Sequence, residues 1–188
     1  HLHFTTNQQA TNRILAMGEE SWRVHTVGFP AIDLISEGRY ANKEYILNEL
    51  DIDISKPIVL FTQHSVTTLY QETSFQIKES LKALKKLSLQ NIQIIITYPN
   101  NDLGGKIIIK EINKYKNFKN IYIFKSLGSE IYHGILYLSK KGKNIVCAGN
   151  SSSGIKETAV FGCPTLNIGT RQKNRMRGNN VIDSDYSS

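Results

Sequence analysis

The sequence predicts an α/β fold built on a doubly wound parallel β-sheet. Short apolar runs rich in β-branched residues alternate with helical patterns through the middle of the chain. These runs are apolar along their whole length, which is typical of parallel strands with both faces buried. With 188 residues, 40% of them hydrophobic and 21% charged, the chain is long enough for one good hydrophobic core. The expected class is therefore Rossmann-like.

The expected elements follow one another in a regular order. Residues 3–20 show a helical pattern that would end at Met17, with Gly18 as its C-terminal cap. Strands are then expected at residues 24–28, 58–62, 92–97, 121–124, 145–148 and 165–168. Helices are expected at residues 74–87, 104–116, 128–140 and 154–161. In the first of these, five apolar side chains lie near one face: Phe75, Ile77, Leu81, Leu84 and Leu87.

The chain is basic, with a formal net charge of +7 and a pI of about 9.3. Its lysines are spread over the predicted helices, and its aromatic residues are not interleaved with the basic ones in an RNA-binding pattern. We interpret most of the charge as solvated helix surface and expect no nucleic-acid partner. No apolar run approaches the length of a membrane span, and the first residues resemble no signal peptide, so no membrane partner is expected.

Cysteine and histidine usage points to a protein without a metal centre. Cys147 and Cys163 both lie in apolar surroundings, which favours buried reduced thiols and a cytoplasmic location. No metal-ligand spacing with a third ligand is found for the four histidines outside the strand ends, which are His1, His3, His25 and His133.

The most informative stretch is CAGNSSSGIKE at residues 147–157. A buried strand is followed by a turn of glycine and serine and then by a helix. The first N–H groups of a helix lack intrahelical partners, and the helix dipole favours an anion there, so this turn is a candidate phosphate site. Residues 151–153 could equally be simple N-terminal caps, and the glycine spacing matches neither the dinucleotide fingerprint nor the P-loop.

Polar side chains also follow the other expected strands. In an open parallel sheet these strand ends share one edge, and ligands bind there. The polar ends are residues 63–64, 99–102, 126, 150–152 and 170–172. His64 could simply begin a helix, Asn100 could belong only to a turn, and Arg171 could be a surface cation. Together, however, a histidine, a carboxamide, serines and an arginine favour a phosphorylated ligand.

Glu157 is the sharpest single residue of this edge. It lies one turn into the helix that follows the serine turn. An acid there either interacts favourably with the helix dipole or accepts hydrogen bonds from the ribose hydroxyls of a nucleotide.

Four motifs, in this order along the chain, resemble the hydrolysing UDP-N-acetylglucosamine 2-epimerases. They are QHSVTT at residues 63–68, YPNNDLG at 98–104, GNSSSGIKE at 149–157 and FGCPTLNIGTRQ at 161–172. The opening HLHF is similar to the segment that leads this family from its first domain toward its second. The resemblance implies a two-domain fold of the GT-B type, of which this chain would be the C-terminal half without its closing helices. Residues 1–20 would be the leading segment, 21–182 the nucleotide-sugar-binding domain and 183–188 a polar tail.

The resemblance also implies roles for individual residues. His64 would lie at the reacting end, against the leaving phosphate and the sugar. Seven residues would bind UDP: Ser151, Ser152 and Arg171 at the diphosphate, Glu157 at the ribose, Asn100 along the site, and Ser126 and Leu127 with their backbone at the uracil.

The reaction of the family is anti-elimination of UDP across C1–C2 of the sugar, followed by addition of water, which yields N-acetylmannosamine for sialic-acid-type synthesis. The resemblance therefore implies a UDP-sugar substrate, no cofactor and a homo-oligomer for the full-length enzyme. Several catalytic carboxylates come from the N-terminal half in this family, so the chain alone should not turn over. Two alternatives stay open: the same chemistry on a UDP-2,4-diacetamido-6-deoxy sugar of a legionaminic-type pathway, and the nucleotide-sugar domain of a GT-B glycosyltransferase.

Overall fold

The computed structural model describes residues 1–186, so the last two residues of the expected polar tail lie outside the described residues. The chain divides into two compact units, His1–Arg39 and Tyr40–Ser188. This division follows residue 39, whereas the sequence suggested a leading segment of residues 1–20.

The first unit is built around two short parallel strands. Its elements are β1 (His3–Thr5), α1 (Gln8–Ala16), the 3-10 helix η1 (Ser21–Arg23), β2 (Val24–Thr26) and α2 (Pro30–Ser36). The prediction of a helix from residue 3 is wrong, because β1 is extended and pairs with β2. Asn7 fixes the start of α1 by accepting a hydrogen bond from the N–H of Ala10 at 2.9 Å. The helix ends one residue earlier than predicted, with Met17 rather than Gly18 as the C-cap, and Gly18 follows with a φ of 96°.

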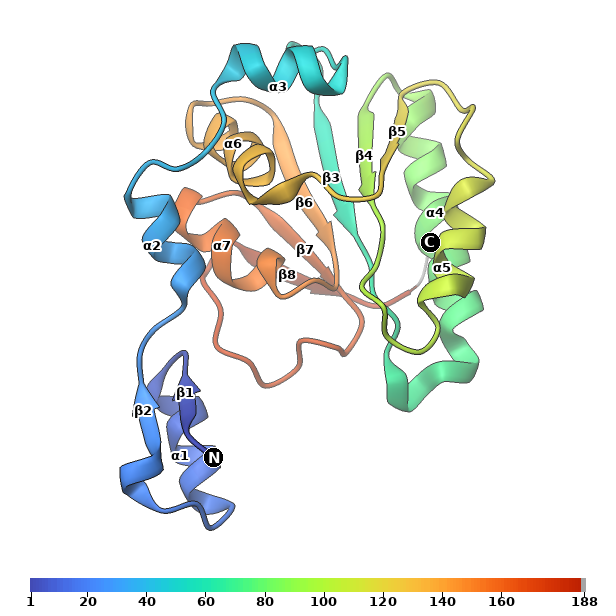
Figure 1. Cartoon of the computed structure of the whole chain (residues 1–188). Helices are drawn as coiled ribbons and strands as arrows, with labels where there is room; N and C mark the ends of the chain where they lie inside the picture. The colour runs from blue at the N-terminus through green and yellow to red at the C-terminus, as the bar shows by residue number, and fades with distance from the viewer. Residues whose placement is uncertain (187–188) are drawn as a thin grey trace. The chain divides into compact units, whose positions relative to one another are not determined.

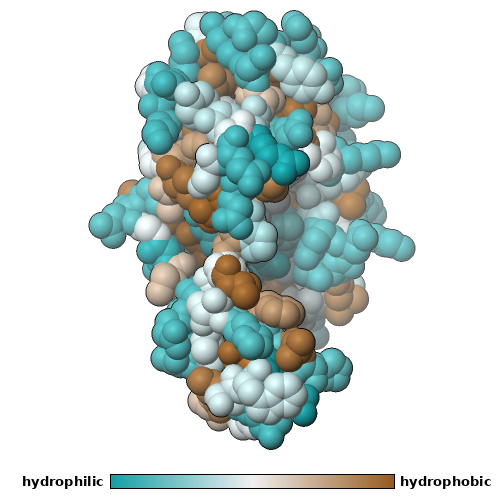
Figure 2. All heavy atoms as spheres, turned by 60° about the vertical axis from the view of Figure 1, so that its left-hand side comes forward, coloured by the Kyte–Doolittle hydropathy of each residue, from teal (hydrophilic) through white to brown (hydrophobic). Residues whose placement is uncertain are grey.

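The surface is mostly hydrophilic on the face drawn in Figure 2, with separate hydrophobic patches between the polar side chains. In the first unit, six large hydrophobic side chains are exposed: Leu2, Phe4, Leu15, Met17, Trp22 and Val27. None of the helices within residues 1–186 combines the length and the apolar composition that a membrane span requires.

Six parallel strands form the sheet of the second unit, in the order β5-β4-β3-β6-β7-β8 (Figure 1). Their bounds are β3 (Ile58–Thr62), β4 (Gln93–Thr97), β5 (Ile121–Phe124), β6 (Ile145–Gly149), β7 (Thr165–Ile168) and β8 (Val181–Ser184). The chain runs from β3 outward to β4 and β5 and then returns to the other side of β3 as β6. The strand order therefore reverses between β3 and β6, and ligands of doubly wound sheets bind at such a reversal.

Helices cover both faces of this sheet, which confirms the predicted doubly wound α/β class. On one face α4 (Thr73–Leu89), which follows the 3-10 helix η2 (Thr67–Glu72), packs beside α5 (Gly105–Asn113). On the other face lie α3 (Lys43–Leu50), α6 (Gly128–Lys140) and α7 (Ser153–Phe161), with α6 in contact with both of the others (Figure 1).

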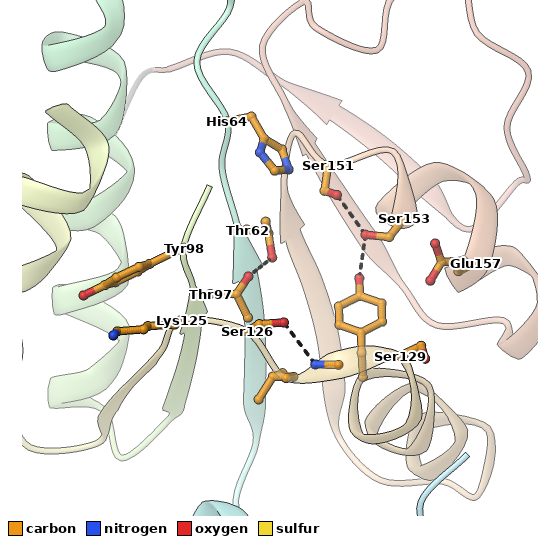
Figure 3. Close-up of a pocket in the computed structure, with 13 residues that line it drawn as sticks. Thr62, His64, Thr97, Tyr98, Lys125, Ser126, Ser129, Ser151, Ser153 and Glu157 are labelled. Atoms are coloured by element: carbon orange, nitrogen blue, oxygen red, sulfur yellow. Dashed lines mark hydrogen bonds between the residues drawn. The ribbon is translucent and has the colours of Figure 1, made fainter. Parts of the chain in front are cut away.

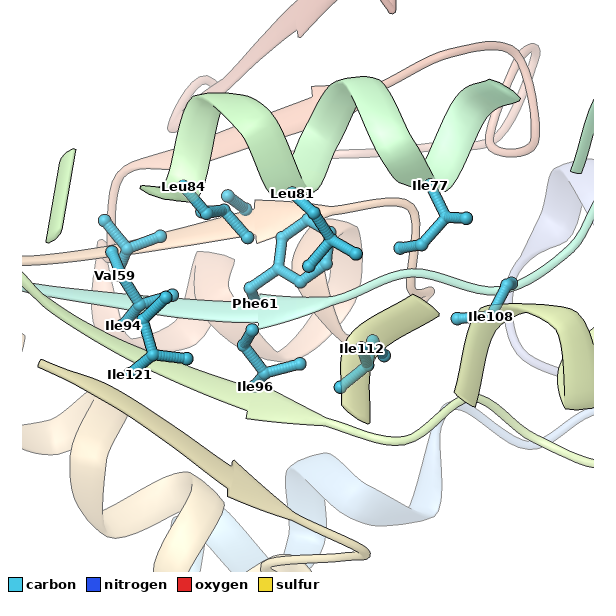
Figure 4. Packing of buried hydrophobic residues seen from close by; sticks show 11 residues of the cluster. Val59, Phe61, Ile77, Leu81, Leu84, Ile94, Ile96, Ile108, Ile112 and Ile121 are labelled. Carbon is cyan, nitrogen blue, oxygen red and sulfur yellow. The ribbon is translucent and has the colours of Figure 1, made fainter. Parts of the chain in front are cut away.

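The best-defined part of the core lies between α4, α5 and the strands beneath them (Figure 4). Phe61 of β3 and Ile77 of α4 are fully buried, and Leu81 and Leu84 of α4 are nearly so. Phe75 departs from the prediction, since 59% of it is exposed. Two residues correspond to about 200° of rotation around a helix, so Phe75 lies away from the face that carries Ile77.

Several elements were not predicted from the sequence. The expected strand at residues 24–28 forms, but it pairs with β1 in its own sheet, and β8 takes the sixth place in the main sheet. The short helices α2 and α3 were also missed. The expected polar tail contributes Asp183 and Ser184 to β8, and Asn167 of β7 donates a hydrogen bond to Asp183 at 2.8 Å. Because β8 is an edge strand and 70% of Ile182 is exposed, the buried apolar run that reveals a strand is absent there.

Candidate functional site

A pocket of about 320 Å³ opens at the carboxyl edge of the sheet, around the reversal between β3 and β6 (Figure 3). Five of the predicted site residues line it: His64, Ser126, Leu127, Ser151 and Glu157. The other three predicted residues lie next to these. Asn100 contacts the ring of His64, and Arg171 donates to the backbone carbonyl of Asn150. Ser152 is the chain neighbour of Ser151. The sheet edge therefore brings together strand ends that are far apart in the sequence.

Gly149 lets β6 turn into α7 at close range to β3. Its φ is 124°, and a Cβ atom at this position would overlap the carbonyl oxygen of Thr62 and lie 2.7 Å from the carbonyl carbon. The N–H of Asn150 instead donates to that oxygen at 3.1 Å. This contact draws the start of α7 to the floor of the pocket, where Thr62 and Thr97 are joined through their hydroxyl groups.

The serine turn is not used simply as a helix cap. Ser152 occupies the N-cap position of α7, but its side chain makes no capping hydrogen bond. Ser153 donates to the hydroxyl of Ser151 at 2.9 Å, and the hydroxyl of Tyr132 lies 3.0 Å from Ser153 (Figure 3). Since Ser153 gives its proton to Ser151, Tyr132 is the donor to Ser153, and Ser151 keeps its own proton for another acceptor. The N–H groups of Gly154 and Ile155 already donate to the carbonyls of Ser151 and Ser152, both at 3.2 Å, so the Ser151 hydroxyl and the dipole of α7 are the features that suit an anion.

The two predicted thiols lie close to this network and are both buried and free, as expected. Cys147 lies 3.5 Å from the hydroxyl of Tyr132. Burial raises the pKa of Cys147 to about 12, so the thiol stays neutral and acts as a small apolar side chain.

Asn150, which the sequence placed at the polar edge without an individual role, joins three strand ends. It is fully buried, its Oδ1 accepts from the N–H of His64 at 2.7 Å, and its Nδ2 donates to the carbonyl of His64 at 2.8 Å. Its own carbonyl accepts from Arg171 at 3.1 Å and from Gln172 at 2.7 Å. The loops after β3, β6 and β7 are thereby locked to one another.

Two groups of Asn100 compete for Nδ1 of His64. The backbone N–H of Asn100 lies 3.0 Å from Nδ1, and Oδ1 of Asn100 lies 3.2 Å from the same nitrogen. In the neutral tautomer that accepts from the N–H, the ring proton is on Nε2; in the other tautomer, Nδ1 donates to Oδ1. The pKa of His64 is lowered from 6.5, mainly by burial and further by the charge of Arg171, while hydrogen bonding to Asn100 and the charge of Asp102 oppose the change. The side chain is therefore a neutral hydrogen-bond donor at neutral pH.

This lowered pKa predicts a pH dependence of stability. Below pH 6.5 the unfolded chain binds more protons at His64 than the folded chain does, so the free energy of unfolding falls as the pH drops through this window. His64→Gln should lose less stability than the wild type over the same range in urea titrations. His25→Gln, at an exposed histidine of the first unit, serves as the control. Equal pH dependence of wild type and His64→Gln would contradict the lowered pKa.

Asn100 and Arg171 meet at a carboxylate that sequence reasoning did not single out. Asn100 Nδ2 donates to Asp102 Oδ2 at 2.6 Å, and Arg171 Nη2 lies 3.9 Å from the same oxygen. Arg171 is half-buried beside the pocket, and burial lowers the pKa of its guanidinium, which still remains charged at neutral pH. Asp102 thus holds the arginine and the amide on the same side of His64.

Glu157 points into the pocket from α7 and has a buried partner. Its Oε2 lies 2.8 Å from Nε2 of His133 on α6. The sequence analysis considered His133 only as a metal ligand. The apolar residues of α6, together with the neighbouring Tyr132, were the sequence signals that His133 faces the core.

Ser126 and Leu127 form the wall between β5 and α6. Ser126 accepts a hydrogen bond from the N–H of Gly128 at 3.2 Å, and Leu127 is the N-cap residue of α6. Both residues line the pocket. Across residues 1–186, no group of three or more histidine, cysteine, aspartate or glutamate side chains is arranged to hold a metal ion.

The chain is similar to several known proteins. A family model described as UDP-N-acetylglucosamine 2-epimerase matches residues 1–188. The chain is 36% identical to a GDP/UDP-N,N'-diacetylbacillosamine 2-epimerase (hydrolyzing) of Campylobacter jejuni and 34% identical to a UDP-N-acetylglucosamine 2-epimerase of Neisseria meningitidis. It is 31% identical to a UDP-N,N'-diacetylbacillosamine 2-epimerase (hydrolyzing) of Legionella pneumophila. Each match covers 100% of this chain, which spans about half the length of these curated relatives (47%, 47% and 48%).

Solved structures share the fold at lower identity. The UDP-GlcNAc 2-epimerase of Methanocaldococcus jannaschii has a TM-score of 0.62 at 18% identity, with 99% of this chain and 52% of that chain covered. The Staphylococcus aureus MnaA-UDP co-structure has a TM-score of 0.59 at 18% identity, with 90% and 42% covered. Because the family model matches the chain from end to end, the chain belongs to the UDP-N-acetylglucosamine 2-epimerase family.

Proposed function

We propose that this chain is the UDP-binding half of a hydrolysing UDP-N-acetylglucosamine 2-epimerase, which converts UDP-N-acetylglucosamine and water to N-acetylmannosamine and UDP. The observation that carries the proposal is the pocket at the strand reversal, where the start of α7, a neutral histidine and a carboxylate converge. The word "hydrolyzing" in the names of two of its relatives also supports it.

The diphosphate is assigned to the serine turn. Ser151 has a hydroxyl proton to donate, Ser152 has no capping bond to break, and Arg171 supplies a positive charge next to Asn150. Glu157 is assigned to the ribose hydroxyls, because a carboxylate accepts hydrogen bonds from both. The backbone at Ser126 and Leu127 borders the remaining wall and is assigned to the uracil, with Asn100 near the sugar end.

The chemistry proceeds in two steps. A base removes the C2 proton of the sugar, the bond from C1 to the UDP oxygen breaks, and the electron pair of the C–H bond forms the C1=C2 double bond of a glycal. Water then adds across this bond, with its oxygen at C1 and a proton at C2 on the opposite face. His64 is assigned to the departing phosphate, since its Nε2–H can donate as negative charge develops there.

The rest of the enzyme is expected to complete the site. By the resemblance to the family, carboxylates for the C2 proton come from the other half, so this chain alone should bind UDP without turning over substrate. We further propose a homo-oligomer for the full-length enzyme and a cytoplasmic location, which the buried free thiols support.

A second substrate deserves a direct comparison. Two of the relatives are named as diacetylbacillosamine 2-epimerases, which favours the same chemistry on a UDP-2,4-diacetamido-6-deoxy sugar. The two substrates differ at C4 and C6 of the sugar, away from the UDP site. Incubating the full-length enzyme with each UDP-sugar and assaying free UDP decides between them, and epimerisation without UDP release would contradict the hydrolysing assignment.

Binding of nucleotides to this chain tests the phosphate site directly. UDP should bind more tightly than uridine, by about tenfold or more, because uridine lacks the groups that Ser151 and Arg171 would hold. Isothermal titration calorimetry at one salt concentration measures both affinities. Ser151→Ala should weaken UDP binding and leave uridine binding unchanged, while Ser36→Ala, at an exposed serine that does not line the pocket, is the control. Equal affinity for UDP and uridine would refute the phosphate role of the turn.

A further inference from the structure

His133 is a buried polar residue with a single defined contact. It lies in α6, only 1% of it is exposed, and its Nε2 is 2.8 Å from Oε2 of Glu157. Within residues 1–186 its other ring nitrogen, Nδ1, is buried and has no hydrogen-bond partner. A buried nitrogen without a hydrogen-bond partner costs free energy of folding, and an apolar side chain at this position would avoid that cost. A functional role for the histidine would explain its presence.

The contact with Glu157 defines which nitrogen carries the proton. A lone pair on Nε2 would face the lone pairs of the carboxylate oxygen, so Nε2 is the donor. The ring has little freedom to turn away, because Phe161 and Tyr132 lie against it with ring centroids at 6.3 and 6.1 Å. The Nε2–H group of His133 is thus held in a fixed orientation before a ligand binds to Glu157.

Glu157 gains a fixed position from this donor. A glutamate side chain has three rotatable bonds, and ordering it costs free energy each time it binds a ligand. Here one oxygen is already bound to His133, while the carboxylate lies on the pocket side of α7 (Figure 3). Its remaining lone pairs are left for a ligand that offers hydroxyl groups.

We propose that His133 is a positioning residue that holds the carboxylate of Glu157 in place to receive the ribose hydroxyls of a nucleotide. The proposal rests on the assignment of Glu157 to the ribose. In this role His133 affects only the recognition of the hydroxyl groups. Without His133, the difference in affinity between a ribose and a dideoxyribose nucleotide becomes smaller, while the contribution of the phosphates to the affinity stays the same.

The test compares UDP with 2′,3′-dideoxy-UDP by calorimetry on the 188-residue chain. His133→Leu removes the donor and keeps a buried apolar side chain. His133→Gln keeps an amide N–H with similar reach. Leu136→Val, at a fully buried position of the same helix, is the control for packing. Glu157→Gln provides the reference for complete loss of the carboxylate.

The expected result is a loss of discrimination without a loss of phosphate binding. Glu157→Gln should lower the preference for UDP over the dideoxy analogue by about tenfold or more. His133→Leu should lower it by about three- to tenfold with the affinity for the analogue unchanged, His133→Gln should retain most of it, and Leu136→Val all of it. The double variant His133→Leu/Glu157→Gln should be no worse than Glu157→Gln, because both changes remove one interaction.

Each failure has its own pattern. If Glu157→Gln leaves the preference unchanged, or UDP does not bind at all, the proposed nucleotide role of Glu157 fails. If Glu157→Gln lowers the preference but His133→Leu does not, or lowers both affinities equally, the role of His133 is overturned while that of Glu157 stands. The nitrogen-15 spectrum of the imidazole rings gives a readout without ligand: the expected state has the His133 proton on Nε2, and a proton on Nδ1 alone would overturn the proposal.

Discussion

Replacing His64 with alanine in the complete enzyme is expected to lower kcat by about 100-fold or more, with a much smaller change in KM. In the proposed role, the N–H of Asn100 is bound to Nδ1, so the neutral ring presents an Nε2–H, and burial beside Arg171 keeps the pKa of the ring low. A hydrogen bond from Nε2 to the phosphate of a bound UDP-sugar would strengthen as UDP leaves and gains charge. Its loss therefore falls on the transition state rather than on substrate binding. Steady-state kinetics with UDP-N-acetylglucosamine measure both constants.

His64→Gln separates two forms of this role. A glutamine amide can donate a hydrogen bond but cannot transfer a proton, so partial recovery of kcat indicates a donor and no recovery indicates proton transfer. A purely structural histidine would behave differently: His64→Ala would lower the melting temperature, because Asn100 loses its acceptor, and turnover would be spared. A kcat near that of the wild type would overturn the catalytic assignment.

The main sheet was predictable because its strands are short, apolar and separated by clear helices. The predicted strands 58–62, 121–124 and 165–168 coincide with β3, β5 and β7. Burial on both faces requires such runs, and few other structures tolerate them. The strands β1 and β8 were missed for the opposite reason. Both strands are short and carry exposed residues, so neither shows a buried apolar pattern. Each is held in an extended conformation by pairing with a neighbouring strand, β1 with β2 and β8 with β7.

The site was predictable in its position but not in its internal connections. The carboxyl edge of a parallel sheet is fixed by topology, so polar residues after the strands are necessarily gathered there. The contacts that orient them join residues far apart in the sequence, such as Asn150 with His64 and Glu157 with His133. No spacing rule links residues on different elements, so sequence reasoning gathered polar groups at the pocket and did not identify the contacts that orient them.

Gly149→Ala is expected to destabilise the second unit by about 2–6 kcal/mol, through backbone strain and steric overlap together. A φ of 124° is strained for any residue with a Cβ atom, and that atom would overlap the carbonyl oxygen of Thr62. The obstacle is backbone of the adjacent strand, so no side-chain rotation relieves it. β3 and β6 would have to separate where Asn150 and the start of α7 depend on their close approach. Urea denaturation followed by circular dichroism measures the loss, and UDP affinity should fall with it.

Gly142→Ala is the matched control, because Gly142 also has a positive φ, of 80°, but nothing lies within 4 Å of its added Cβ atom. It should cost only the conformational strain, about 1–2 kcal/mol, and leave UDP binding unchanged. The difference between the two variants measures the overlap with Thr62 together with the greater backbone strain of a φ of 124°. If Gly149→Ala proved as stable as Gly142→Ala, the close approach of β6 to β3 would not restrict residue 149 to glycine. The explanation that this approach fixes the position of the start of α7 would then be wrong.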